Sequence, residues 1–167
     1  MKEVTKQMIQ YHFPRWEELP QLELYIDQVV IYLQELLSPF DKEGSVTPTM
    51  INNYVKQKIV SPPTKKKYSR EHLACFFVIF TMKRLMNIST LGTIITQMRA
   101  IYETEDAYNL FCEEMEYALK STFEPKKFPP RTYQEKEQTE LSLIRSMGIT
   151  FAQMVLTDKL IAMQQEK

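Results

Sequence analysis

Apolar residues recur every three or four positions along most of the chain, which is the spacing of helices that bury one face. The pattern predicts helices over residues 22 to 37, about 48 to 58, 70 to 86, 89 to 101, 104 to 122, 133 to 147 and 150 to 165. The stretch from Ile59 to Tyr68 combines β-branched residues, a double proline and three lysines, and predicts a small extended ribbon around a turn. The fold is therefore predicted to be mainly α.

Capping residues set the boundaries of several predicted helices. Thr47 followed by Pro48 suits the N-cap and the first position of a helix. Ser69 and Ser89 are expected to cap later helices, and Asn87 is expected to end the helix before Ser89 in a left-handed conformation.

Prolines and glycine divide the chain into predicted parts. Residues 1 to 20 predict an irregular, proline-punctuated aromatic arm, with Trp16 docked on the core. Gly148 is expected to separate two final helices. The predicted parts are a helical domain at 1–123, a proline-rich linker at 124–132 and a C-terminal helical pair at 133–167.

Composition indicates a globular chain, because 44% of the residues are hydrophobic and 25% are charged. The longest apolar run, Leu73 to Met82, is about half of the roughly 20 residues that span a bilayer, and predicts a buried helix instead. The N-terminus shows no secretory signal. We expect a soluble, cytoplasmic protein without a membrane segment.

Residues suited to catalysis or metal binding are scarce. The chain has only three glycines, which argues against loops that cradle phosphates, and no Ser, His and acid set stands at a recognisable spacing. His72 and Cys75 share a helical face but are too few to hold zinc, and Cys75 and Cys112 are expected to be buried free thiols. We expect no enzyme, no metal site and no cofactor.

Charge is unevenly distributed although the chain as a whole is neutral. Residues 47 to 86 carry eight basic residues and one acid, a net charge of +7, whereas the remainder carries 13 basic and 20 acidic residues, a net charge of −7. A basic module on an otherwise acidic chain is typical of a surface that binds phosphates, although lysine runs also occur on merely solvated faces.

The order of elements in this basic module resembles the winged helix-turn-helix of the MerR family of bacterial regulators. The matching residues are Thr49-Met50-Ile51-Asn52-Asn53-Tyr54-Val55-Lys56, Ile59-Val60-Ser61-Pro62-Pro63, Lys67-Tyr68-Ser69-Arg70-Glu71-His72-Leu73 and Asn87-Ile88-Ser89-Thr90-Leu91. The resemblance implies a winged helix-turn-helix at about 45–103, with further helices at both ends and at most a short β-hairpin wing. The family's usual Arg-Tyr is replaced by Asn52-Asn53, and the wing is short.

Binding to double-stranded DNA would then use a recognition helix at about 48–58 and a lysine-rich wing at 64–68. Asparagine amides can pair with adenine in the major groove, whereas cationic side chains hold phosphates. The expected base contacts are Thr49, Asn52 and Asn53. The expected phosphate contacts are Lys56, Lys58, Lys65, Lys66, Lys67 and Arg70.

Residues 8 to 123 also resemble an uncharacterised bacterial family catalogued as domain of unknown function 1836. The resemblance is carried by Phe-Pro-Arg-Trp-Glu-Glu-Leu-Pro at residues 13 to 20 and by the stretch from Met50 to Lys56. It implies no established activity.

Three partner hypotheses accompany DNA binding. The main alternative is a winged-helix module that binds protein and not DNA. The apolar C-terminal helices predict a homodimer. A small-molecule effector of unknown identity is compatible with either function, in a pocket between the helices after Ser89 and the C-terminal pair.

Overall fold

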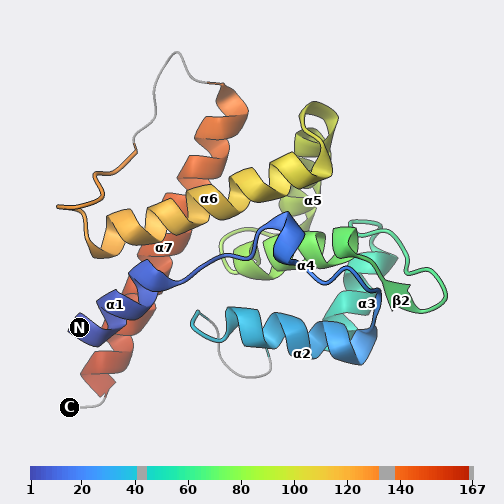
Figure 1. The fold of residues 1–167 in the computed structure, drawn as a ribbon, viewed down its shortest axis with the longest axis horizontal. Helices are drawn as coiled ribbons and strands as arrows, with labels where there is room; N and C mark the ends of the chain where they lie inside the picture. The colour runs from blue at the N-terminus through green and yellow to red at the C-terminus, as the bar shows by residue number, and fades with distance from the viewer. Residues whose placement is uncertain (41–44, 132–137, 166–167) are drawn as a thin grey trace. The chain divides into compact units, whose positions relative to one another are not determined.

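The computed structural model describes residues 1–40, 45–131 and 138–165, and these are mainly helical (Figure 1). Strands β1 and β2 form a two-stranded antiparallel sheet. The elements are α1 (Lys2–Gln10), the 3-10 turn η1 (Trp16–Glu18), β1 (Leu24–Tyr25), α2 (Ile26–Leu37), α3 (Pro48–Lys56), β2 (Lys67–Tyr68), α4 (Arg70–Met82), α5 (Ile88–Ile101), α6 (Thr104–Phe123) and α7 (Thr139–Gln165). The mainly α class with a short ribbon is confirmed.

The chain forms two compact units. The first unit is Pro14–Tyr108, and the second unit combines Met1–Phe13 with Asn109–Lys167. The division therefore falls near the start of α6, whereas the sequence predicted a linker at 124–132. Described residues 124–131 belong to the second unit, and residues 132–137 lie outside the described part of the chain.

Helix α4 forms the core of the first unit, and α2, α5 and β2 pack against it. Leu73, Phe76, Phe77 and Ile79 are fully buried, because the ten-residue apolar run leaves almost no polar face on this helix. The predicted buried helix is confirmed. No described helix combines the length and the apolarity that crossing a membrane requires.

The second unit is built from α1, most of α6 and α7. Phe13 is fully buried and packs edge-to-face on Phe151 of α7, with ring centroids 6.2 Å apart. Gly148 lies inside α7, which continues unbroken from Thr139 to Gln165. The predicted break at Gly148 is therefore wrong, and the two expected C-terminal helices are one.

Local predictions near the other helix ends had mixed outcomes. Thr47 caps α3 as predicted, since its Oγ1 accepts a hydrogen bond from the Met50 N–H at 3.2 Å. Asn87 does not end a helix in the left-handed region. Its φ is −69°, and its side chain caps α5 by accepting from the Thr90 N–H at 2.9 Å, so Ser89 lies inside that helix.

The prediction for the N-terminal arm was partly wrong, and the prediction for the two cysteines is confirmed. Residues 1 to 20 were expected to be irregular, but they contain α1 and η1. Trp16 packs edge-to-face on Tyr108 at 6.3 Å, as its predicted docking requires. Cys75 and Cys112 are buried and free as predicted, and burial raises the pKa of the Cys75 thiol to about 11.

Candidate nucleic-acid interface

Helix α3 presents one polar face to solvent. Thr49, Asn52, Asn53 and Lys56 are all exposed, and their spacing places them along one side of the helix. The opposite side is anchored, because Ile51 is fully buried. The three predicted base contacts therefore share one accessible face of the predicted recognition helix, which ends at Lys56, two residues earlier than expected.

Lys58, two residues after the end of α3, has a strained backbone conformation. Lys58 has a φ of +59°, and its N–H donates to the Val55 carbonyl at 2.9 Å. A residue in this left-handed conformation commonly ends a helix, but glycine or asparagine usually fills the position because a side chain there is strained.

Two further lysines form a tight hairpin turn. Thr64 and Lys67 exchange two backbone hydrogen bonds, of 3.1 and 2.9 Å, and Lys65 and Lys66 between them have φ values of +50° and +65°. Positive φ at both central residues is the type I′ hairpin geometry, for which Asn-Gly is the preferred sequence. We call Thr64–Lys67 the lysine hairpin.

Strand pairing fixes the base of the lysine hairpin. In β2, Lys67 lies opposite Tyr25 and Tyr68 lies opposite Leu24 of β1. The Lys67 ammonium lies 5.2 Å from the centre of the Tyr25 ring, and Tyr68 is buried. The hairpin thus projects its exposed tip, Lys65 and Lys66, from an anchored strand.

His72 of α4 is hydrogen-bonded to Ser61 and Ser69, which lie on either side of the lysine hairpin in the sequence. Its Nδ1 accepts a hydrogen bond from the Ser69 N–H at 2.9 Å. The ring proton must therefore be on Nε2, which lies 3.1 Å from the Ser61 carbonyl oxygen and donates to it. The sequence pattern did not predict this anchoring role of His72. Among the described residues, no group of side chains suited to hold a metal ion is present.

Arg70 was predicted to contact phosphate, but in the structure its side chain contacts other parts of the protein. One guanidinium nitrogen lies 3.6 Å from a Glu17 carboxylate oxygen, and another donates to the Leu19 carbonyl at 3.3 Å. The same guanidinium lies over the Trp16 ring at 5.7 Å. Arg70 therefore holds η1 against α4, and a sequence pattern could not reveal partners this far away in the chain.

The remaining predicted phosphate contacts differ in accessibility. Lys67 is half-buried, like Arg70, whereas Lys56, Lys58, Lys65 and Lys66 are exposed. These four lysines make no ion pair with any described residue. Their positive charges are therefore balanced by no carboxylate in the described part of the chain.

The structure defines a mainly helical protein whose first unit exposes a polar helix face and four lysines. A family model described as Domain of unknown function (DUF1836) matches residues 14–111, more than half of the chain. The chain belongs to this family, and the match covers the whole first unit, Pro14–Tyr108. No curated protein and no solved structure matches the chain.

Proposed function

We propose that the chain binds double-stranded DNA through α3 and the lysine hairpin. The observation that carries the proposal is that Lys58, Lys65 and Lys66 all occupy the left-handed region. Each costs about 1 kcal/mol relative to glycine. Strain of this kind is typical of functional positions, and an external polyanion would supply the negative charge that no described carboxylate provides.

In this mechanism α3 enters the major groove with its exposed face toward the bases. The amides of Asn52 and Asn53 offer the paired donor and acceptor that adenine N7 and N6 match, and Thr49 contacts a neighbouring base edge. The exposed lysines hold phosphates on either side and supply affinity without sequence information. The resemblance to MerR regulators, which rests on the sequence motifs, is a further reason for this proposal.

The decisive test keeps the backbone conformation of the lysine hairpin and removes the charges of Lys65 and Lys66. The double variant K65N/K66G places the preferred type I′ sequence in the turn, so the fold should be unchanged or more stable. If both lysines contact phosphates, the slope of log affinity against log salt should become shallower by about 1.8, because each contact contributes about 0.9. Fluorescence anisotropy with duplex DNA at several salt concentrations measures this slope.

The matched control is K2Q/K6Q, which removes the same charge from exposed positions in the second unit. The control should leave the slope nearly unchanged. An unchanged slope in K65N/K66G, or an equal effect in both variants, would contradict the assigned role of the lysine hairpin.

A protein partner is the second candidate, and exposed apolar side chains in the first unit favour it. Leu22 is 81% exposed, and Tyr25 and Ile31 are also largely exposed. Anisotropy with random duplex DNA at low salt separates the two functions, because a DNA-binding module shows non-specific affinity there. No binding under those conditions would favour the protein partner.

We further propose that the chain forms a homodimer through the C-terminal part of α7. Leu160 and Ile161 are exposed on this helix, although α7 already buries another face in its own unit. Light scattering at micromolar concentration is expected to give the mass of a dimer, and L160E/I161E is expected to give that of a monomer. A monomer mass for the unmodified chain would contradict this proposal.

A further inference from the structure

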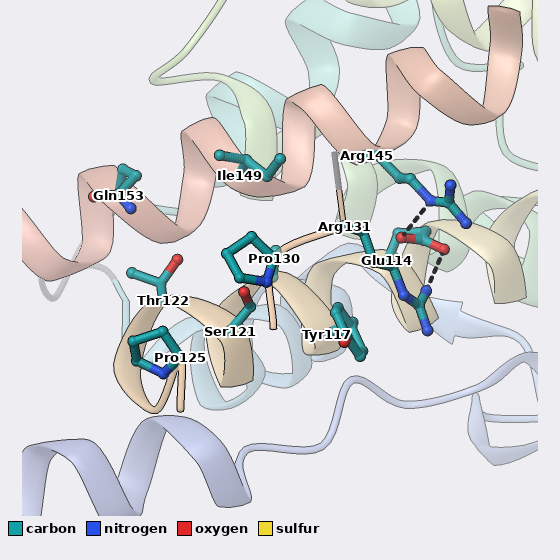
Figure 2. Close-up of a pocket in the computed structure, with 11 residues that line it drawn as sticks. Glu114, Tyr117, Ser121, Thr122, Pro125, Pro130, Arg131, Arg145, Ile149 and Gln153 are labelled. Carbon is teal, nitrogen blue, oxygen red and sulfur yellow. Dashed lines mark hydrogen bonds and ion pairs between the residues drawn. The ribbon is translucent and has the colours of Figure 1, made fainter. Parts of the chain in front are cut away.

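A cleft of about 200 Å³ lies in the second unit between α6, α7 and the proline-rich segment after α6 (Figure 2). This volume is below the roughly 300 to 1,000 Å³ of sites for drug-sized ligands, so its occupant must be small. Its lining includes Glu114 and Tyr117 from α6, Arg145 and Ile149 from α7, and Pro130 and Arg131 from the segment.

One end of the cleft is cationic. The buried Glu114 carboxylate accepts from Arg131 Nη1 at 2.6 Å and from Arg145 Nε at 3.3 Å, as Figure 2 shows. Two guanidinium groups therefore converge on one carboxylate at this end of the cleft. Arg131 also stacks 3.7 Å from the centre of the Tyr117 ring, whose hydroxyl donates to the Pro129 carbonyl at 2.9 Å. These contacts fix the cationic end before any ligand arrives.

A serine hydroxyl lies farther along the cleft. Ser121 is only 8% exposed, lines the cleft and makes no hydrogen bond with any described residue. In Figure 2 its oxygen points from α6 toward Pro130. A ligand oxygen that reaches this part of the cleft could therefore form a hydrogen bond with the Ser121 hydroxyl.

The middle of the cleft is apolar, and the spacing of the lining residues along α7 gives the length of the whole cleft. Arg145, Ile149 and Gln153 are spaced four residues apart and line the cleft from α7, and eight residues of helix span about 12 Å. Ala118 and Pro130 line the cleft from its other walls. The lining therefore runs from a cationic end, over an apolar middle, to the neutral amide of Gln153.

We propose that this cleft binds a short carboxylic acid with an apolar chain, its carboxylate at Arg131 and its chain against Ile149. A guanidinium pairs with a carboxylate through two parallel hydrogen bonds, and Arg131 uses only one of its nitrogens on Glu114. A free phosphate fits less well, because the apolar walls offer it too few donors. The proposal does not depend on DNA binding, which lies in the other unit.

The probe is hexanoate, with hexanamide as its uncharged counterpart, in calorimetric titrations of the full chain. Hexanoate is expected to bind saturably at one site per chain, and hexanamide at least tenfold more weakly. Ile149→Trp fills the cleft and should weaken hexanoate binding at least tenfold. Ile101→Trp adds the same ring at an exposed isoleucine of α5 in the other unit and should leave hexanoate binding unchanged. Ser121→Ala should weaken binding by a few-fold, and circular dichroism confirms that each variant is folded.

Four results would overturn the proposal. The first is an absence of saturable hexanoate binding to the unmodified chain, and the second is hexanoate binding to folded Ile149→Trp that is as tight as to the unmodified chain. Equal binding of hexanamide would show that the arginine end recognises no charge. A response to inorganic phosphate but not to hexanoate would likewise exclude the apolar acid and leave an anion site only.

Discussion

Replacing Gly148 by leucine is expected to destabilise the second unit by about 3 kcal/mol, the upper end of the roughly 1 to 3 kcal/mol that overpacking a close contact usually costs. A Cβ at this position would lie 3.0 Å from Met115 Cε and 3.1 Å from the Glu114 carbonyl oxygen. The methyl of Met115 can move, but the backbone of α6 can do so only if the two helices separate. Even Gly148→Ala is expected to destabilise, although alanine favours a helix by about 1 kcal/mol.

Gly92 supplies the matched control within α5. Its added Cβ would lie 3.2 Å from Cγ1 of Ile59, the flexible part of a half-buried side chain. Gly92→Ala should therefore gain helix propensity at little steric cost and be neutral or stabilising by up to about 1 kcal/mol. Urea unfolding followed by circular dichroism gives both values. Equal stabilisation by the two alanine variants would show that α6 and α7 do not approach closely at Gly148.

The structural role of Gly148 could not be predicted from the sequence alone. A single glycine between two apolar stretches fits a helix break, because glycine often ends helices, and equally fits a close crossing of two helices. The apolar spacing on either side is the same in both cases. Only the position of α6 against Gly148 decides, and that position depends on packing across the whole unit.

Local rules explain the predictions that succeeded. Thr47 and Pro48 determine the start of α3 from adjacent residues, and the apolar run of α4 allows no arrangement other than burial. The exposed face with Asn52 and Asn53 follows from helical spacing once Ile51 is assigned to the core. These features depend on residues within a few positions of one another, which a sequence pattern contains.

Features of the candidate site that depend on distant partners could not be predicted. The lysine hairpin was expected as a short ribbon, but the left-handed conformations of Lys65 and Lys66 accompany a strand pairing with Leu24–Tyr25. Propensity alone would place glycine or asparagine there. Arg70 looked like a surface cation, yet its partners Glu17 and Leu19 lie about 50 residues earlier.

His72→Ala is expected to lower the free energy of unfolding by about 2 to 4 kcal/mol. The substitution removes a buried ring and leaves the Ser69 N–H and the Ser61 carbonyl without their hydrogen bonds, each worth about 1 kcal/mol or more when left unsatisfied. The ring also packs edge-to-face on Tyr68 at 5.4 Å, so strand β2 should loosen with it. Denaturant unfolding measures the global loss, and amide hydrogen exchange at Lys67 measures the local one.

His72→Gln distinguishes the hydrogen bond to Ser69 from the hydrogen bond to Ser61. Glutamine at the third helical position accepts from the N-cap N–H in the Ser-x-x-Gln capping box, so it should keep the bond to Ser69 and lose only the bond to Ser61. Its cost should be about half that of His72→Ala, with exchange faster near Ser61 than near Ser69. If both variants were as stable as the unmodified chain, His72 would not anchor the loop, and another contact would have to hold the lysine hairpin against α4.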